Sequence, residues 1–319
     1  MASQLPAQTF NGDAQRELLL APRLKKGDLI ALTAPAGAIF NKESIGKARL
    51  ALEGLGFRVR ECESLGRQYG YLAGTDEQRA QELMELFTDD SVNGIVAMRG
   101  GWGCARLLPL LDFEKIRQHP KVLSGFSDIT TLLLTLQAKT GLVTFHGPVG
   151  NSSWSPLTNR FFMSCVSENT QPEMIDSEAD PICLGTAEGK LLGGNLAVLC
   201  SLLGTSYLPD FKDALLFLEE TEEEPYSIDR MLTQLDLAGV LRQVRGVIFG
   251  KCTKCDAEEP EKSFTLREVL QQKLGALNIP AITNFSFGHT VDKYTFPVGV
   301  RARMDVGNRT VQLLENSVL

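Results

Sequence analysis

Strand-like and amphipathic segments alternate along the first half of the chain, which sets the expected fold class. The strand-like runs are residues 28–34, 57–60, 94–98 and 122–125, and the helical segments between them begin at Ser44, Asp76 and Cys104. Strands that alternate with helices predict right-handed crossovers and a mostly parallel sheet. Ligands bind such sheets at the carboxyl ends of the strands. We therefore predict an N-terminal α/β domain with its site at that edge.

The alternation weakens after residue 148 and then resumes in a second unit that is richer in strands towards its end. Its strand-like runs are 190–192, 214–218, 244–249, 281–283, 298–304 and 310–314, and its helical segments are 195–203, 225–237 and 265–274. Composition shifts divide the chain further. The predicted parts are a flexible leader (1–22), an N-terminal domain (23–170), a polar connection (171–188) and a C-terminal domain (189–319).

The stretch 121–138 contains the candidate nucleophile, Ser127. A short apolar strand there turns abruptly at Phe126-Ser127 into an apolar helix. The first N–H groups of a helix have no intrahelical partner and can stabilise negative charge beside Ser127 Oγ. A simpler reading is that Ser127 or Asp128 caps the helix, and this stretch alone favours the cap. A nucleophile needs a base, an acid and a second oxyanion donor from elsewhere.

Composition excludes several classes of protein. The 319 residues carry a formal charge of −7 and a pI near 5.2, with no basic cluster, so a nucleic-acid partner is not expected. No apolar run is long enough to cross a bilayer and no secretory signal is visible, so we expect a cytoplasmic protein with no membrane partner. Seven scattered cysteines do not form a disulfide framework. We interpret Cys252 and Cys255 as two thiols in a loop, and expect neither a metal nor a cofactor.

Three histidines are available as the base. His119 precedes a proline in an expected surface loop, whereas His146 and His289 each lie near the end of a strand. Either of the last two would serve, and sequence spacing leaves them about even.

The acid is predicted at Glu219, which ends the apolar strand 215–218 and would be held rigidly there. Its acidic neighbours, Glu220 and residues 222–224, are expected in a solvated loop. Asp128 is an alternative acid, but adjacent residues at a helix start point apart, so we interpret it as a cap or supporting group.

The glycine-rich turn Arg99-Gly-Gly-Trp-Gly103 follows a buried strand and offers backbone N–H groups for an oxyanion. A phosphate-binding turn is the alternative, but the Gly-Lys-Ser/Thr ending of a nucleotide loop is missing. The order Ser127, Glu219, His289 is that of α/β-hydrolases. However, Ile129 stands where their nucleophile turn has its second glycine, which argues against that fold.

Taken together, these motifs resemble the LD-carboxypeptidases, serine peptidases also called muramoyltetrapeptide carboxypeptidases, whose relatives include the microcin C immunity peptidases. The resemblance covers residues 24–314, and its markers are Gly27–Pro35, Arg99–Gly103, Gly125–Asp128, His146–Pro148, Gly193–Leu196, Leu216–Glu219, Pro225–Arg230 and Phe287–His289. It implies a triad of Ser127, Glu219 and His289, with backbone oxyanion donors at Gly100, Gly101 and Asp128. The resemblance also resolves the choice of histidine in favour of His289. Two positions differ from the family pattern: Trp102 stands where its members usually have tyrosine, and Glu220 stands where they often have aspartate.

The resemblance also implies an N-terminal α/β domain, a C-terminal β-rich domain, an active site at their interface and a homodimer. The family substrate is the murein tetrapeptide, cut before its terminal D-alanine during cell-wall recycling. A cation should hold the terminal carboxylate, and Arg99 and Arg230 are both candidates. The alternatives are a microcin-type immunity peptidase and a binding protein without catalysis.

Overall fold

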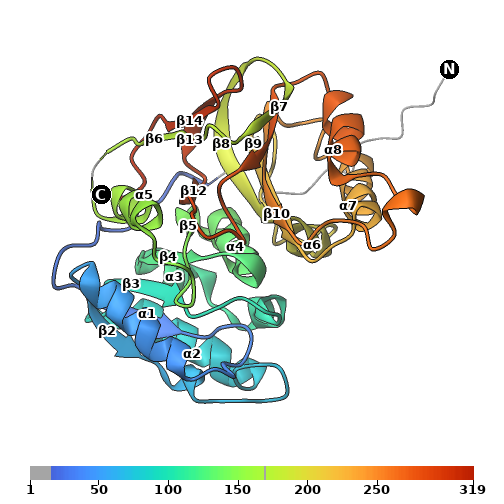
Figure 1. The fold of residues 1–319 in the computed structure, drawn as a ribbon. Coiled ribbons are helices and arrows are strands. Elements are labelled where there is room, and N and C mark those ends of the chain that lie inside the picture. Colours follow the sequence, from blue (N-terminus) through green and yellow to red (C-terminus); the bar gives the residue numbers. More distant parts are fainter. Residues whose placement is uncertain (1–15, 169) are drawn as a thin grey trace.

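The computed structural model describes residues 16–168 and 170–319, which form two lobes, each around its own sheet (Figure 1). Most of the predicted leader, residues 1–15, lies outside the described residues. Its last residues are docked on the N-terminal lobe: Leu19 N donates to Gly141 O at 2.8 Å. Close by, the C-terminal Leu319 donates its N–H to Ala21 O at 2.9 Å. The two ends of the described chain therefore meet.

The N-terminal sheet has the order β12-β5-β4-β3-β1-β2, and every neighbouring pair is parallel except β12 with β5. Its strands are β1 (Leu29–Thr33), β2 (Arg58–Glu61), β3 (Gly94–Ala97), β4 (Val122–Gly125), β5 (Thr144–His146) and β12 (Phe296–Val298). The predicted mostly parallel α/β architecture is confirmed. The edge strand β12 comes from the far end of the chain, so the C-terminal half completes the N-terminal sheet.

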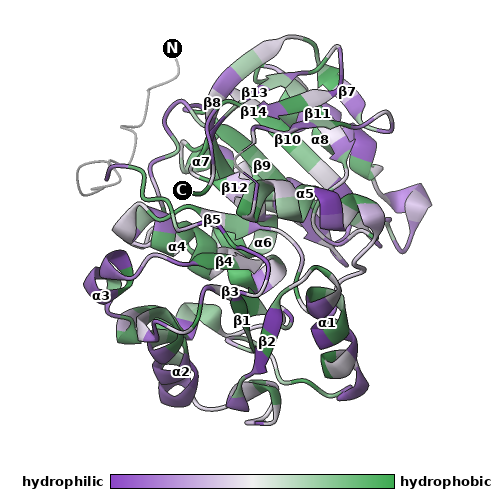
Figure 2. Cartoon of the chain, turned by 90° about the vertical axis from the view of Figure 1, so that its left-hand side faces the viewer, coloured by the Kyte–Doolittle hydropathy of each residue, from purple (hydrophilic) through white to green (hydrophobic). Residues whose placement is uncertain are grey.

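Helices cover both faces of this sheet, with α1 on one face and α2, α3 and α4 on the other (Figure 2). Their polar sides point outward, as expected for amphipathic helices. The elements are α1 (Glu43–Gly54), η1 (Glu63–Leu65), α2 (Asp76–Thr88), η2 (Cys104–Leu110), α3 (Phe113–Gln118), η3 (Ser127–Ile129), α4 (Thr130–Thr140) and α5 (Pro156–Val166). Of these, α4 is buried almost throughout, because it also packs against the second lobe.

The C-terminal sheet has the order β6-β14-β13-β8-β9-β10-β11-β7. Its strands are β6 (Glu173–Ile175), β7 (Asp180–Cys183), β8 (Thr186–Asn195), β9 (Leu215–Thr221), β10 (Gly246–Thr253), β11 (Ala281–Phe285), β13 (Arg301–Asp305) and β14 (Thr310–Leu313). The four central strands from β8 to β11 are parallel and the outer pairs are antiparallel. The expected connection, residues 171–188, contributes strands to both edges of this sheet. The proposed domain limits of 23–170 and 189–319 stay a prediction.

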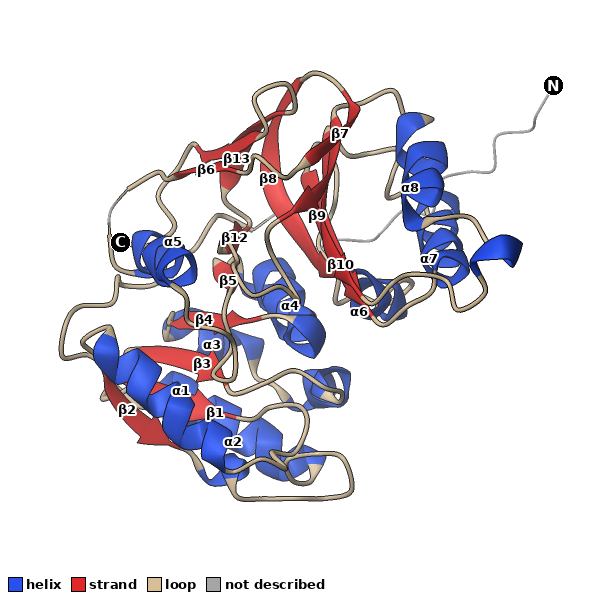
Figure 3. Cartoon of the chain, in the orientation of Figure 1, coloured by secondary structure: helices blue, strands red, loops and turns tan. Residues whose placement is uncertain are grey.

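Helices α6 (Leu196–Ser201), α7 (Pro225–Leu237) and α8 (Leu266–Gly275), with η4 (Pro260–Lys262), lie along one side of this sheet (Figure 3). The two lobes meet where α4 packs against β8 and α6. At this contact Asn195 N donates to Thr130 Oγ1 at 3.0 Å. A Cβ atom on Gly194 would lie 2.5 Å from the Thr130 side chain, so only glycine permits this approach. The helix that follows Ser127 is therefore fixed to the C-terminal lobe. Within the described ranges, no helix combines the length and apolar character that crossing a membrane requires.

Candidate active site

Ser127 lies at the carboxyl end of β4, at the turn where the prediction placed it. Its φ of 63° is left-handed, which is uncommon outside glycine and typical of a strained turn. Its neighbours Phe126 and Asp128 are buried, whereas Ser127 is partly exposed. The capping interpretation is wrong, because neither η3 nor α4 has a side-chain hydrogen bond at its N-cap. The hydroxyl group of Ser127 is thus left free of a structural role.

The glycine turn 99–103 packs directly on the nucleophile turn. A Cβ atom on Gly100 would lie 2.8 Å from Ser127 Oγ and 3.2 Å from Asp128 N, so a side chain there would displace the serine. The carboxylate of Asp128 accepts a hydrogen bond from Cys104 N at 2.8 Å. Asp128 therefore ties the two turns together through its side chain, which fits the supporting role predicted for it. The backbone donors at Gly100, Gly101 and Asp128 remain a prediction.

Glu219 and His289 are brought together from positions 70 residues apart. His289 Nδ1 lies 2.7 Å from Glu219 Oε2, and His289 N donates to the same oxygen at 3.3 Å. Glu219 is fully buried near the carboxyl end of β9, a central strand that pairs with both β8 and β10. Gly288 makes this contact possible, because its φ is 79° and a Cβ atom there would lie 2.4 Å from Glu219 Oε2.

The two side chains shift each other's titration in opposite directions. Burial alone would raise the pKa of Glu219, but the hydrogen bond and charge of His289 outweigh it and lower that pKa. Burial likewise opposes protonation of His289, but the hydrogen bond and charge of Glu219 raise its pKa above the ordinary value. A carboxylate acceptor requires a proton on Nδ1, so Nε2 of the neutral ring is the basic nitrogen.

Phe126 connects this pair with the nucleophile turn. The imidazole of His289 packs edge-on against its ring, with 4.8 Å between ring centroids. Ser127 follows Phe126 directly in the sequence, so His289 packs against the ring of the residue that precedes the serine. Ser127 Oγ makes no hydrogen bond to another described residue. Catalytic contacts of this kind commonly tighten only when substrate binds.

His146 has quite different surroundings. It ends β5 and is 1% exposed, and neither ring nitrogen has a hydrogen-bond partner among the described residues. Three aromatic rings pack around it, those of Phe126, Phe217 and Phe287. This burial lowers the pKa of His146 to about 4. The surroundings of the two histidines therefore distinguish them, because only His289 has a carboxylate partner among the described residues.

Glu220 departs from the prediction of a solvated loop. It is 2% exposed, and it accepts hydrogen bonds from Asn195 Nδ2 and Ala197 N, both at 2.8 Å. The physical reason is that the start of α6 presents N–H groups that need an acceptor. Sequence reasoning missed this role, although the motif Gly193-Gly-Asn-Leu196 at a helix start was a signal for it. Glu222 is exposed and pairs with Lys254, as expected of a surface residue.

The two candidate cations differ in position. Arg99 is half-buried beside the glycine turn and donates from Nη1 to Ala38 O at 3.0 Å. A Cβ atom on Gly101 would lie 3.6 Å from Arg99 Nη2. Arg230 is exposed on α7, where its guanidinium lies 5.8 Å from the centre of the Tyr226 ring. Arg99 is therefore the one that lies against the turns carrying the candidate site.

The cysteines are all free thiols, including Cys252 on β10 and Cys255 just after it. Over residues 16–168 and 170–319, no cluster of three His, Cys, Asp or Glu side chains is arranged to hold a metal ion.

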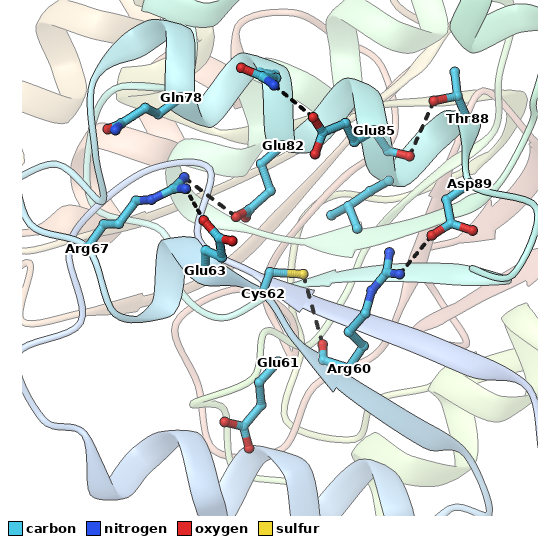
Figure 4. A pocket seen from close by; sticks show the side chains of 12 residues that line it. Arg60, Glu61, Cys62, Glu63, Arg67, Gln78, Glu82, Glu85, Thr88 and Asp89 are labelled. Atoms are coloured by element: carbon cyan, nitrogen blue, oxygen red, sulfur yellow. Dashed lines mark hydrogen bonds and ion pairs between the residues drawn. The ribbon is translucent and has the colours of Figure 1, made fainter.

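A groove beside β2, η1 and α2 contains none of the predicted site residues (Figure 4). Several of its charged side chains are paired with one another, with Arg60 Nη1 2.7 Å from Asp89 Oδ2 and Arg67 bonded to Glu63. Glu82 accepts from Thr33 Oγ1 at 2.6 Å and so joins α2 to β1. These side chains have structural partners and hold the N-terminal lobe together.

Comparison with known sequences supports both halves of the resemblance. The profile of the LD-carboxypeptidase N-terminal domain matches residues 30–147, and that of the C-terminal domain matches residues 188–304. A probable murein peptide carboxypeptidase of Bacillus subtilis is 39% identical over 294 residues, which cover 90% of this chain and 92% of the relative.

Two solved structures extend the comparison to the fold. The protein MccF in complex with glutamyl sulfamoyl guanosine is 26% identical with a TM-score of 0.88, covering 94% of this chain and all of the other. The muramoyltetrapeptide carboxypeptidase of Oxalobacter formigenes is 32% identical with a TM-score of 0.79, covering 89% of this chain and 97% of the other.

Proposed function

Because the chain belongs to the LD-carboxypeptidase family, we propose that it is a serine carboxypeptidase whose triad is Ser127, Glu219 and His289. The observation that carries the proposal is the 2.7 Å contact between His289 Nδ1 and Glu219 Oε2, beside the ring that precedes Ser127. Its substrate is a peptide. We propose more narrowly that this peptide is the murein tetrapeptide and that the enzyme releases its terminal D-alanine in cell-wall recycling.

The mechanism is acyl transfer in two halves. His289 Nε2 takes the proton of Ser127 Oγ, which attacks the carbonyl carbon before the D-alanine, while Glu219 holds the imidazole and stabilises its positive charge. Backbone N–H groups of Asp128 and of the Gly100-Gly101 turn stabilise the oxyanion. His289 then protonates the departing amine, and water repeats the cycle on the acyl-enzyme to release the shortened peptide.

We propose Arg99 rather than Arg230 as the cation that holds the terminal carboxylate. Arg99 precedes the Gly100-Gly101 turn, and among the described residues it donates only from Nη1, to Ala38 O. A guanidinium there can form a bidentate contact with a carboxylate. Arg99→Lys should raise KM for the tetrapeptide by about tenfold with a smaller change in kcat, since a point charge replaces a planar fork. Arg230→Lys is the matched control, and an equal effect there would contradict the choice.

Replacement of Ser127 by alanine tests whether the protein is an enzyme at all. Loss of the nucleophile should reduce D-alanine release by several orders of magnitude. The free energy of unfolding should stay within about 1 kcal/mol, because the hydroxyl caps no helix. Unchanged hydrolysis by this variant would overturn the triad, and a wild-type protein that binds the peptide but never cuts it would favour a binding protein.

A microcin-type immunity peptidase is the second candidate, favoured by the TM-score of 0.88 to MccF against 0.79 to the muramoyltetrapeptide carboxypeptidase. The same triad would then cut a peptidyl or aminoacyl nucleotide. Measuring kcat/KM for the tetrapeptide and for an aminoacyl-sulfamoyl adenylate separates the two functions. We expect the tetrapeptide to be preferred, and a clear preference for the adenylate would reverse that order.

We further propose a homodimer that acts in the cytoplasm, as the family resemblance implies. Light scattering on the purified protein should give a mass of about twice the 34.9 kDa of the chain. A monomer at micromolar concentration would contradict the dimer.

A further inference from the structure

Lys293 is a buried lysine beside the proposed triad that the mechanism does not use. It is 3% exposed and lies four residues after His289, in the loop between β11 and β12. Its Nζ donates to Thr290 O at 2.5 Å, and it forms no ion pair with a described carboxylate. Burying an ammonium group is costly unless it is hydrogen-bonded or paired. An apolar side chain at this position would carry no such cost.

The ammonium touches both halves of the proposed site. On one side it bonds the carbonyl group of Thr290, the residue after His289. On the other side Nζ lies 5.4 Å from the centre of the Phe126 ring, a cation–π contact with the residue before Ser127. The same ring receives the edge of the His289 imidazole at 4.8 Å. One cation therefore links the histidine turn to the nucleophile turn.

The backbone of Lys293 is anchored as well. Its N–H donates to Thr158 Oγ1 on α5 at 3.2 Å, so the loop is attached to the N-terminal lobe. The next residue, Tyr294, donates its N–H to Ser286 O at 2.7 Å and closes the loop on itself. The ammonium group thus has a defined position relative to both turns.

The charge of Lys293 also acts on the groups around it. Burial lowers the pKa of Lys293 to about 8, while Glu219 and Asp292 favour its proton. At neutral pH the lysine is therefore still mostly charged. Glu219 and Glu220 raise the pKa of His289, whereas Lys293 lowers it. His146, buried nearby, is also affected by Lys293, which disfavours a second positive charge.

On the basis of the proposed function, we propose that Lys293 is a positioning residue. It holds the turn of His289 against Phe126 and Ser127, and its positive charge disfavours a second positive charge on the His289 imidazole. Without the ammonium, burial alone would oppose the effect of Glu219 and Glu220 on the imidazole. His289 would then bind its proton more tightly, and the acid limb of kcat/KM would move to higher pH.

The test replaces Lys293 by methionine, which keeps the unbranched shape of the side chain up to the ε position and removes the ammonium group. Lys121→Met is the matched control. Lys121 is also buried, donates from Nζ to Val92 O at 2.7 Å and to Asp89 O, and precedes β4 at the opposite end from Ser127. Both variants lose a buried ammonium, so both should lose stability, but only Lys293→Met should disturb the histidine.

The readout is an NMR titration of the imidazole signals in protein labelled with ¹³C-histidine, since the chain has only three histidines. We expect the midpoint of His289 to move to higher pH in Lys293→Met and to stay in place in Lys121→Met. An unmoved midpoint in Lys293→Met would overturn the electrostatic part. This measurement needs no substrate, so it tests the role of Lys293 independently of catalysis. Failure to cut the tetrapeptide would contradict the proposed function instead.

Activity then tests the positioning part. On the cleaved peptide, Lys293→Met should lower kcat by on the order of tenfold to a hundredfold with little change in KM. Lys293→Arg keeps the charge and should restore part of kcat and the wild-type acid limb. If Lys293→Met does not fold, the wild-type His289 signal should show a second inflection near pH 8, where Lys293 loses its proton. Its absence would equally contradict the proposal.

Discussion

His146 and His289 lie near the ends of two strands, one in each lobe, and yet, of the two, only His289 has a carboxylate partner among the residues that the structure describes. Both rings pack against Phe126, at 6.1 Å and 4.8 Å between centroids. The charge of Glu219 acts to raise the pKa of both histidines. His146 is almost completely buried and has no hydrogen-bond partner in the described part of the chain, whereas the side chain of His289 is 23% exposed and bonded to Glu219.

The difference shows that a position at a strand end does not make a histidine basic. Burial among aromatic rings lowers the pKa of His146 to about 4, so it stays neutral at neutral pH. Contact with a carboxylate raises the pKa of His289 and fixes its tautomer. The predictions below separate these two environments, beginning with the largest expected effect.

Replacing His289 by asparagine should have the largest effect. The base and the acid of the mechanism are lost together, so kcat for D-alanine release should fall by roughly five to six orders of magnitude. His146→Asn is the comparison at the other strand end and should retain most of the turnover of the folded enzyme. A variant at position 146 that lost as much activity as the one at 289 would reverse the assignment.

Glu219→Gln should come next. The amide group can donate to Nδ1 and favour the wrong tautomer, so kcat should fall by about 10⁴-fold. Loss of the negative charge also lowers the pKa of His289, so any residual activity should extend to lower pH than in the wild type. Glu222→Gln, an exposed carboxylate just past the same strand, is the control. An acid limb that moved upward in Glu219→Gln would contradict this electrostatic account.

Gly288→Ala tests the close approach that joins Glu219 to His289. Its methyl group would lie 2.4 Å from Glu219 Oε2 and must push the carboxylate or the histidine away. A displacement of about 1 Å can cost on the order of a hundredfold in kcat. Gly204→Ala is the matched control, because Gly204 has a φ of 81° with open space around it. Gly204→Ala has the same backbone strain, about 1 kcal/mol, but no steric clash with a neighbouring side chain. Equal activity of the two variants would show that the contact is not needed.

His146→Leu should have the smallest effect on turnover and a clear one on stability. The folded protein holds His146 with a pKa of about 4, against an ordinary 6.5, so protons favour the unfolded chain between these values. This group should therefore remove up to about 3 kcal/mol of stability as the pH falls from 6.5 to 4. Urea unfolding at several pH values should show that this loss is reduced in His146→Leu. An unchanged slope would mean that His146 titrates normally.

Local patterns predicted the parts of the site that are built from neighbouring residues. The strand, turn and helix around Ser127 lie within 20 residues, and apolar periodicity was enough to find them. Glu219 was proposed in the same way, as the polar residue that ends an apolar run, and it lies 2.7 Å from His289 Nδ1. The glycine before His289 indicated a close approach, and Gly288 makes one with Glu219.

Non-local contacts were beyond such patterns. The choice of His289 over His146 depends on which ring reaches Glu219, a contact between separate strands, and only the family resemblance pointed to it. Glu220 was misassigned because an acidic run is usually solvated, whereas here Asn195 and the start of α6 supply its partners. Strand β12 joins the sheet of the other lobe, which the order of segments along the chain does not show. Each of these depends on long-range packing.

The most direct measurement is the rate at which a serine-directed fluorophosphonate labels the protein, followed by peptide mapping of the modified residue. The account predicts one label, on Ser127, that forms at the wild-type rate in His146→Leu and at least a hundredfold more slowly in His289→Asn. Labelling of a different residue, or an equal rate in His289→Asn, would contradict a triad assembled from the two lobes.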